Sequence, residues 1–570
     1  MIGEDETMTK KLKINRITWL FLALLAFSMV LLPTKATVRE NSNRNTDLAA
    51  QNGLSQLGNP KMEYALSELF EIYSTQGIER AKEFAKQRKI DLEDNRVRVV
   101  VEGHSPEIGQ KTRRTSLLEY QLRGFGARIE ATYNQLIQSW VPVSNLQNIA
   151  SLLSVKYLRL PLKPRLLTIS EGVAKTGADQ WQFLKPYRTQ ENVKVCILDA
   201  GFEGYESLLG SELPSTVTAK SFRADGNIQA DIKHGTACAE IVHDMAPEAD
   251  LYLVNFNTDV EQHNAVDWLI SQGVKIISYS IGWTNAGRGD GTGPICEDVK
   301  KAADAGITWV SAAGNDAKDH WEGTFNDPDE DRWHNFAGNE EILRWWVPAY
   351  NYVAAYLNWD DWGTWNGLDY SGSGQNYDLY LFLRQGGAWI LVDKSANLQT
   401  GAQWPIEGIG YYWSSVSTYW GIAIKKTDAT RDCKLELFAV GNQDPIEYNV
   451  PEGSLTIPAD SDRAVAVGAT DWRDDSYHTY SSRGPTIDGR TKPDFSAPSG
   501  VSTMSYGPTA FLGTSASAPH VAGAFALLSG KTPYSLEQIY AILQNRAVDL
   551  GPAGKDNQFG YGRLNLKKKQ

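Results

Sequence analysis

Hydrophobic positions in the middle of the chain alternate between two periodicities. From residue 193 to residue 312, short runs of apolar and β-branched residues are separated by longer stretches with helical spacing. The pattern predicts strands at 193–198, 249–254, 274–280 and 307–312, and helices at 234–244, 260–271 and 294–305. Strands that alternate with helices form parallel βαβ units. We therefore expect an α/β domain built on a doubly wound, mostly parallel sheet.

The N-terminal part of the chain has a different pattern. Residues 62–90 have helical spacing, interrupted at Gly77, and strand-like alternation follows. We predict strands at 97–101, 128–132, 136–143 and 155–160, and helices at 116–123 and 146–153. This βαββαβ order is typical of a ferredoxin-like α+β unit, which we assign to residues 96–165. A generic accessory domain is the alternative interpretation.

The βα rhythm stops near Asn326, and about 125 residues of different composition follow. Ten of the 18 tryptophans lie between Trp333 and Trp420. Short alternating strands are predicted at 352–358, 377–384, 388–392, 418–425 and 434–440. We interpret residues 326–450 as an inserted all-β sandwich, which divides the α/β domain into 166–325 and 451–570. The aromatic side chains either fill the core of this sandwich or line a surface that binds carbohydrate or protein.

The beginning of the chain carries an export pattern. Basic residues at 10–16 precede an apolar run at 17–32, and small residues follow at 34–36. The pattern indicates a signal peptide at 1–36, with an uncleaved membrane anchor as the alternative. Residues 37–95 are then a polar tether and a helical segment. We expect a protein that is secreted or associated with the cell envelope, without a transmembrane domain after signal removal. The net charge of −12 argues against nucleic acid as a partner.

Ser515 stands where a turn of small residues meets an apolar helix. The run Gly-Thr-Ser-Ala-Ser-Ala-Pro-His at 513–520 leads into the apolar segment 521–528. Backbone N–H groups and the positive end of the helix dipole point toward a hydroxyl in this position. A serine nucleophile needs a base within hydrogen-bond reach and an acid that orients the base. Ser515 is therefore a candidate nucleophile whose partners must be found elsewhere in the chain.

Those partners stand at the predicted ends of other elements. Among eight histidines, His234 opens a His-Gly-Thr run ahead of an apolar helix, and we expect it to be the base. Asp199 ends a buried strand, at the edge of an α/β sheet where reacting groups gather, and is the candidate acid. Asn315 follows another buried strand, and its amide can stabilise an oxyanion together with the Ser515 N–H. His520 lies in the helix of Ser515 and is interpreted as a packing or hydrogen-bonding residue.

Together these motifs resemble the subtilisin-like serine peptidases. The resemblance rests on Asp-Ala-Gly at 199–201, His-Gly-Thr at 234–236, Ala-Ala-Gly-Asn at 312–315, Ser-Arg-Gly-Pro at 482–485 and Lys-Pro-Asp-Phe-Ser-Ala-Pro at 492–498. It covers about 168–324 and 456–566. Ala200 departs from the family's usual Thr or Ser. Ala516 replaces a common methionine, which should make the site less sensitive to oxidation.

The resemblance implies a serine endopeptidase that acts on protein or peptide substrates. Its triad would be Asp199, His234 and Ser515, with Asn315 as the oxyanion donor. The substrate-binding residues would be Ser280, Ile281, Gly282, Ala313 and Gly314, with the substrate extended along the first three. Residues 96–165 resemble the family's inhibitory propeptide, and we expect self-cleavage between about 160 and 175. The alternatives are an inactive subtilisin-like binding protein whose Trp-rich insert attaches to a surface or glycan, and a transpeptidase or cyclase.

Cysteines and acidic residues add weaker signals. Four cysteines are too few for a disulfide framework; Cys196 and Cys238 are expected to be buried thiols, and a Cys296–Cys433 pair is left open. Catalysis of this type requires no cofactor. Residues Asp327, Asp329 and Asp331 are spaced like the start of a calcium loop, but the expected glycine and closing glutamate are missing. A structural calcium ion and a hydrated acidic turn are the alternatives, and the resemblance also allows calcium elsewhere.

Overall fold

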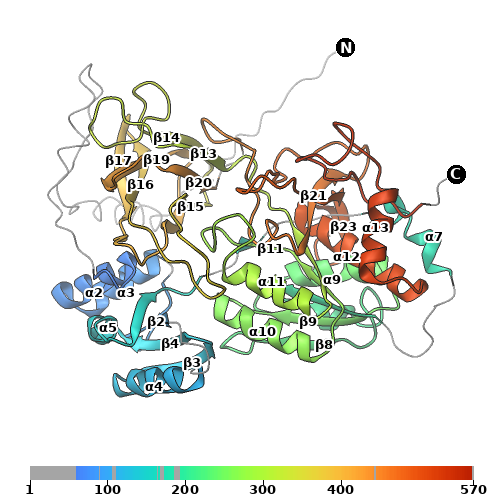
Figure 1. Cartoon of the computed structure of the whole chain (residues 1–570), viewed down its shortest axis with the longest axis horizontal. Helices are drawn as coiled ribbons and strands as arrows, with labels where there is room; N and C mark the ends of the chain where they lie inside the picture. The colour runs from blue at the N-terminus through green and yellow to red at the C-terminus, as the bar shows by residue number, and fades with distance from the viewer. Residues whose placement is uncertain are drawn as a thin grey trace, which may run out of the picture.

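The computed structural model describes residues 59–88, 90–104, 111–162, 165–166, 172–184, 193–441 and 444–567. The expected signal peptide at 1–36 and the tether up to residue 58 lie outside the described residues. Figure 1 shows an N-terminal unit (blue and cyan), a central α/β domain (green and red) and a set of strands (yellow and orange) that is inserted in the sequence between the two halves of that domain and lies beside it. Within the described ranges, no helix combines the length and apolar character needed to cross a membrane.

The central domain is built on a seven-stranded sheet in which every neighbouring pair is parallel. The strand order is β22 (Phe495–Ser499), β21 (Ala464–Asp471), β12 (Thr308–Ala312), β10 (Ile276–Tyr279), β7 (Lys194–Asp199), β9 (Asp250–Asn255) and β8 (Thr218–Ser221). The expected mostly parallel α/β sheet is therefore confirmed.

Helices cover both faces of this sheet, which explains why its strands are apolar runs. One face packs on α9 (His234–Met245) and α12 (Thr514–Lys531), and the other on α10 (Asp259–Ser271) and α11 (Pro294–Asp304). Along β7, Val195 and Ile197 point into the first core, whereas Cys196 and Leu198 point into the second. The strand ends, where side chains leave these cores, are the positions that can carry chemistry.

The N-terminal unit begins with two helices, α2 (Tyr64–Gln76) and α3 (Ile78–Gln87), separated by Gly77 at a φ of 84°. Its sheet has the order β5-β2-β4-β3, and all of these pairs are antiparallel. The elements are β1 (Leu92–Glu93), β2 (Arg96–Gly103), α4 (Lys111–Gly124), β3 (Arg128–Tyr133), β4 (Leu136–Pro142), α5 (Leu146–Ala150) and β5 (Val155–Arg159). The helices α2, α3 and α5 share one hydrophobic core with this sheet.

Two four-stranded antiparallel sheets lie between β12 and β21 in the sequence. One contains β13 (His320–Thr324), β20 (Lys434–Val440), β15 (Asn351–Trp359) and β18 (Ile406–Ser414). The other contains β14 (Leu343–Val347), β19 (Thr418–Asp428), β16 (Asn376–Gln385) and β17 (Ala388–Ser395). Both contribute to one core that includes Trp345, Trp359 and Trp420, while Trp346 and Trp413 are exposed. Strands β13, β14 and β18 were not predicted from the sequence, and β13 starts ahead of residue 326.

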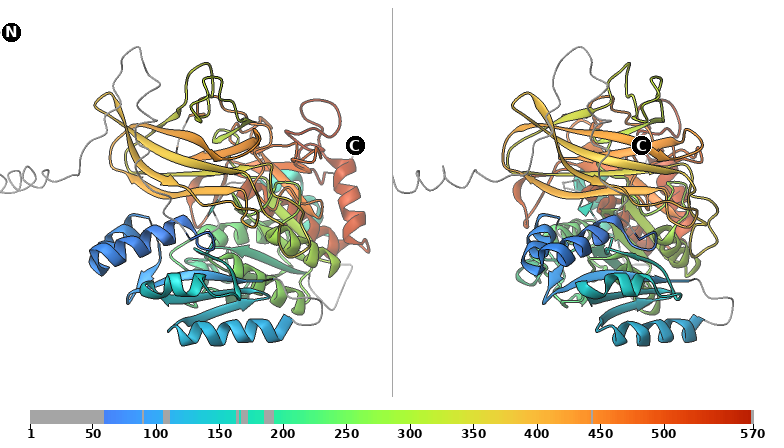
Figure 2. Two further views of the ribbon diagram at one scale, coloured as in Figure 1. Left: turned by 60° about the vertical axis from the view of Figure 1, so that its left-hand side comes forward. Right: turned by 90° about the vertical axis from the view of Figure 1, so that its left-hand side faces the viewer.

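The inserted sheets lie over both other units (Figure 2). The Tyr64 N–H at the start of α2 donates to Asn397, and Arg88 pairs with Asp393 on β17. On the α/β side, the Asn285 amide donates to the carbonyls of Leu357 and Glu407 at 3.2 and 2.8 Å. The insert therefore contacts both other units directly.

All four cysteines are buried free thiols, so the open Cys296–Cys433 pairing is not formed. The Cys296 thiol donates to the carboxylate of Asp460 at 3.4 Å, whereas Cys433 packs in the core of the insert. Cys196 and Cys238 are buried on either side of the central sheet, as expected for packing thiols.

Candidate active site

Asp199 and His234 form a buried pair at one edge of the central sheet. Asp199 is the last residue of β7 and His234 the first residue of α9. The His234 Nδ1 lies 2.9 and 2.8 Å from the two carboxylate oxygens of Asp199, and the two side chains are 2% and 0% exposed. The Ala200 N–H also donates to the carboxylate at 2.8 Å, and this bond does not depend on the side chain at position 200. With Nδ1 donating to Asp199, Nε2 is the basic nitrogen of His234.

Gly235 allows the helix to begin this close to the strand. A Cβ on this residue would lie 2.7 Å from the Gly201 oxygen and 2.8 Å from the Asp199 Cβ, which is too close for any other residue. Its N–H donates to the Gly201 carbonyl at 3.0 Å, which holds the first turn of α9 against the end of β7. The glycine of the His-Gly-Thr run is thus required for the Asp–His contact.

Ser515 is the second residue of α12 and is fully buried. Its hydroxyl donates to the Ser280 carbonyl at 3.2 Å, and the Ser280 hydroxyl donates to the Ser515 carbonyl at 2.8 Å. The thiol of Cys238, one turn after His234 on α9, donates to the same carbonyl at 3.5 Å. Helices α9 and α12 pack against each other along this contact. The candidate base and nucleophile therefore stand at the starts of two touching helices.

Asn315 is fixed beside the candidate nucleophile by the residue that precedes it. The Asn315 Oδ1 accepts hydrogen bonds from the Thr514 N–H at 3.0 Å and from the Thr514 hydroxyl at 3.1 Å. Because the oxygen is held in this way, the amide nitrogen is the part of the side chain that can act as a donor to a ligand. The preceding Gly314 has a φ of 114°, and a Cβ there would meet the Ser482 hydroxyl at 2.6 Å. Thr514 was not singled out in the sequence, although it belongs to the serine motif.

A segment from the end of the N-terminal unit lies along the strand next to Ser515. Strand β6 (Arg165–Leu166) pairs antiparallel with β11 (Ile281–Gly282), with Leu166 opposite Ile281 and Arg165 opposite Gly282. A cavity of about 820 Å³ adjoins this place and is lined by residues of all three units, among them Asn315. The chain that leaves β5 thus reaches the strand that includes Ile281 and Gly282, both predicted substrate-binding residues.

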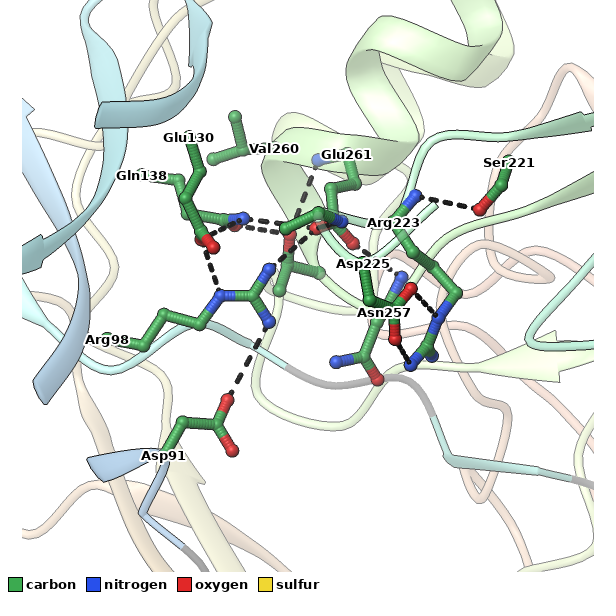
Figure 3. Close-up of polar contacts among 12 residues, drawn as sticks. Asp91, Arg98, Glu130, Gln138, Ser221, Arg223, Asp225, Asn257, Val260 and Glu261 are labelled. Atoms are coloured by element: carbon green, nitrogen blue, oxygen red, sulfur yellow. Dashed lines mark hydrogen bonds and ion pairs between the residues drawn. The ribbon is translucent and has the colours of Figure 1, made fainter. Parts of the chain in front are cut away.

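Buried charges join the N-terminal unit to the start of α10 (Figure 3). The Arg98 guanidinium on β2 donates to Glu261 at 2.8 Å and to Glu130 at 2.6 Å, and the Glu261 side chain is 1% exposed. Gln138 on β4 donates to the same Glu261 at 3.1 Å. Nearby, Arg159 on β5 pairs with Asp259, the first residue of α10. These contacts have no counterpart among the sequence predictions, because charged residues far apart in the chain give no pairing signal.

The remaining predicted residues have clear positions. His520 is buried, its Nδ1 lies 2.7 Å from the Ala516 carbonyl one turn earlier, and burial lowers its pKa to about 4. Ala313 is fully buried, and its N–H donates to the Val467 carbonyl on β21 at 2.9 Å. Ala516 is also fully buried. The structure therefore gathers the predicted acid, base, serine and amide, with the predicted substrate strand, at the carboxyl edge of the parallel sheet.

A comparison with protein families agrees with this arrangement. The model described as the Subtilase family matches residues 190–336 and 407–562, which is more than half of the chain. This chain is a member of the subtilase family. The unmatched stretch between the two segments of the subtilase match falls within the inserted sheets.

Several proteins resemble this subtilase over part of its length. An "Extracellular serine protease" of Serratia marcescens is 28% identical over 223 residues, which is 33% of this chain and 20% of that protein. "Alkaline elastase YaB" of Bacillus sp. (strain YaB) is 38% identical over 120 residues, 21% of this chain and 30% of that protein. The chain thus spans less than a third of the length of these relatives. The solved structure of the Clostridium perfringens CspB protease aligns with a TM-score of 0.47 and 15% identity, over 69% of this chain and 98% of that one.

Proposed function

We propose that this subtilase is a secreted serine endopeptidase in which Asp199, His234 and Ser515 form the triad and Asn315 is an oxyanion donor. The observation that carries the proposal is the buried Asp199–His234 pair at the start of a helix that touches the helix of Ser515. An aspartate in this position orients the imidazole and stabilises it when it becomes positively charged. No cofactor is required for the steps below.

The reaction begins when the Ser515 hydroxyl turns from the Ser280 carbonyl toward the Nε2 of His234. His234 takes the hydroxyl proton as the oxygen attacks the substrate carbonyl, and Asp199 stabilises the imidazolium. The Asn315 amide and the Ser515 N–H donate to the oxyanion. His234 then gives the proton to the leaving amine, and water releases the acyl group by the same route in reverse.

The substrate peptide is proposed to lie extended along Ser280, Ile281 and Gly282, with Ala313 and Gly314 as further binding residues. Main-chain hydrogen bonds give affinity in this mode, and side-chain pockets give selectivity. The pairing of β6 with β11 supports an extended, antiparallel substrate, because Ile281 and Gly282 already pair with an added antiparallel strand.

We also propose that residues 96–165 are a ferredoxin-like propeptide that inhibits the enzyme and is removed by self-cleavage. Its strand order, its buried ion pairs with α10 and the position of β6 in the substrate groove support this role. Because Ile281 lies opposite Leu166 and the neighbouring Ser280 binds the Ser515 hydroxyl, the register favours cleavage just after Leu166. This position falls within the window of 160–175 predicted from the sequence.

The proposed organisation also includes a signal peptide at 1–36 and a β-sandwich insert at about 326–450 between the two peptidase segments. Export agrees with the word "extracellular" in the name of the Serratia relative. A second candidate function is an inactive binding protein that attaches through the insert. It is favoured by two exposed aromatic pairs, Trp346 with Tyr419 at 5.1 Å and Tyr352 with Trp413 at 4.7 Å between ring centroids.

The variant Ser515→Ala tests the proposal in the full chain. We expect casein hydrolysis to fall by about 10⁴-fold or more and self-cleavage products to disappear from mass spectra. Ser529→Ala is the matched control, because its hydroxyl lies on the same helix α12 and has no hydrogen-bond partner among the residues that the structure describes. If Ser515→Ala remains as active as the wild type, Ser515 is not the nucleophile. If the wild type is inactive and is not labelled by a phosphonate probe, the binding protein is the better account.

A further inference from the structure

The cavity of about 820 Å³ beside the proposed substrate strand follows the line of that strand. Strand β11 pairs antiparallel with β6, and Ile281 lies opposite Leu166. In such a pair, each step forward along one strand is a step back along its partner. Four steps forward lead to Asn285, and four steps back lead to Leu162. Both residues line the cavity, which therefore lies where the chain ahead of the proposed cleavage site passes.

The chain ahead of β6 already runs along this cavity. Leu160, Pro161 and Leu162 follow β5 directly and belong to the lining. Pro161 is buried, and Leu162 packs against the core cluster of the α/β domain that contains Trp283. A segment that is cleaved by its own enzyme is the first substrate of that enzyme. The surface that this segment contacts therefore stays available to later substrates when the N-terminal unit leaves.

The insert forms the wall of the cavity that faces the α/β domain. Tyr356 of β15 and Gly408 of β18, which lie opposite each other, belong to this wall. The two hydrogen bonds from the Asn285 amide to carbonyls of the insert hold the walls together. Amides, aromatic rings and glycines make up most of the lining that the insert and the α/β domain supply, and the charged residues described there are Asp319 and Glu407. The basic residues described in the lining all belong to the N-terminal unit: Arg88, Lys156 and Arg159. Once that unit leaves, the described lining offers carboxyl groups but no basic group.

Two buried oxygens of this lining have no hydrogen-bond donor in the described part of the chain. They are the Oδ1 of Asn285 in the α/β domain and the Oε1 of Gln399 in the loop between β17 and β18. The two residues are only 7% and 4% exposed. Asn285 also has a φ of 58°, a conformation that costs energy for a residue other than glycine and that recurs at functional sites. A buried acceptor without a donor is costly, so both oxygens favour a ligand that supplies N–H groups.

Given the peptidase function proposed above, we propose that the insert and the α/β domain form a substrate subsite here. It takes an extended, uncharged segment centred on the fifth residue before the scissile bond, which is Leu162 in self-cleavage after Leu166. Main-chain N–H groups of such a segment can donate to Asn285 and Gln399. Acidic side chains are disfavoured, because the described lining that is left after release gives them no basic partner. The protein therefore selects long extended chains over short peptides.

The test compares fluorogenic peptides that the self-processed protein cleaves. A short peptide carries the sequence of residues 163–170, and a long peptide carries that of residues 160–170. We expect kcat/KM to be about tenfold higher for the long peptide, mainly through a lower KM, because the added residues bind away from the reacting bond. A long peptide with Leu162→Glu should be cleaved about tenfold less efficiently than one with Leu162→Gln, which has a similar shape and no charge.

Two variants of the lining test where the longer peptide binds. Gly408→Leu places a side chain in the cavity, and its Cβ would lie 3.5 and 3.9 Å from two atoms of the Tyr356 ring, which is ordinary contact. Gln399→Met removes the amide and keeps the length of the side chain. Each should bring the ratio of kcat/KM for the long and short peptides down to about one. Gly374→Leu is the matched control, because this glycine of the insert is exposed and a Cβ there would meet nothing within 4 Å.

Three results would contradict the proposal in different ways. Equal kcat/KM for the two peptides in the wild type would overturn the subsite and leave the peptidase function intact. A length preference that persists in both Gly408→Leu and Gln399→Met, with each variant folded by circular dichroism, would also overturn it, since the added residues then bind elsewhere. A wild type that cleaves neither peptide nor casein would refute the proposed function and the subsite together.

Discussion

Replacing Arg159 by methionine would remove a charge that holds the N-terminal unit on the peptidase domain. The Arg159 guanidinium pairs with Asp259 at the start of α10 and, within its own unit, donates to Glu102 at 2.6 Å. The side chains of Arg159 and Asp259 are only 10% and 2% exposed. Methionine fills similar space without a charge, so the substitution tests the ion pair and not the packing.

The size of the effect on association follows from the Asp259 carboxylate, which stays buried when Arg159 is replaced. Without Arg159, the Asp259 carboxylate faces a thioether while the units are together, and removing one partner of a buried pair costs about 3–5 kcal/mol. Once the units separate, Asp259 regains water, so this cost weakens their association. Glu102 loses its partner Arg159 whether the units are together or apart, so it contributes less to the change in their association. The cost corresponds to association weakened by about 150- to 5,000-fold.

The assay measures how fast peptidase activity appears when self-cleaved protein is diluted into a peptide substrate. Arg128→Met is the matched control, because its pair with Glu93 lies on the same unit with side chains 61% and 59% exposed. Such a pair contributes about 0–1 kcal/mol, so the control should change the rate by fivefold at most. Circular dichroism of both variants with Ser515→Ala verifies folding. If Arg159→Met gains activity no faster than Arg128→Met, the buried pair does not hold the proposed propeptide in place.

Three further predictions concern the reaction, the processing site and pH. Asn315→Ala should lower kcat by about 10²–10³ and leave KM almost unchanged in steady-state peptide kinetics, because the amide acts on the oxyanion; an unchanged kcat would remove its role. N-terminal sequencing of the processed enzyme should find a first residue just after Leu166, and a start outside 160–175 would contradict the register of β6. Burial lowers the pKa of His263, but the Asp298 carboxylate outweighs this effect, so the pKa is raised above the ordinary histidine value. The charged imidazole therefore stabilises the folded protein fully at pH values below the ordinary pKa, and this stabilisation is lost as the pH rises through the raised pKa. His263→Gln with Ser515→Ala should therefore lower the Tm more at about pH 5.5 than at about pH 9, and an equal loss at both would show that the charge is not involved.

The central sheet could be predicted because the residues that determine each strand are neighbours in the sequence. The strands of a parallel sheet covered on both faces are continuous apolar runs, and β7 shows how alternate residues enter opposite cores. Asp199 and His234 could be found for the same reason, since each stands where an apolar element meets a short glycine-containing turn. The close approach of the two elements, which requires Gly235, is a local property of the same motif.

What could not be predicted depends on contacts between distant residues. Strand β13 is short and contains His320 and Glu322, and it forms because it pairs with β20 more than a hundred residues later. Arg98 and Glu261 are charged residues that a sequence pattern assigns to the surface, yet they meet in a buried interface. Charge and hydropathy along the chain do not specify these partners.

The chain leaves the insert close to the proposed substrate-binding residues. The chain returns from the insert through Thr456, whose N–H donates to the Ala313 carbonyl at 3.0 Å. A Cβ on Gly282 would meet the Thr456 Oγ1 at 2.6 Å, and a Cβ on Gly314 would meet its Cγ2 at 3.0 Å. Thr456 therefore packs against both glycines among the proposed substrate-binding residues and fixes their separation. The point where the chain re-enters the domain after the insert therefore lies directly beside the proposed substrate-binding residues, and Thr456 is the residue that joins the two.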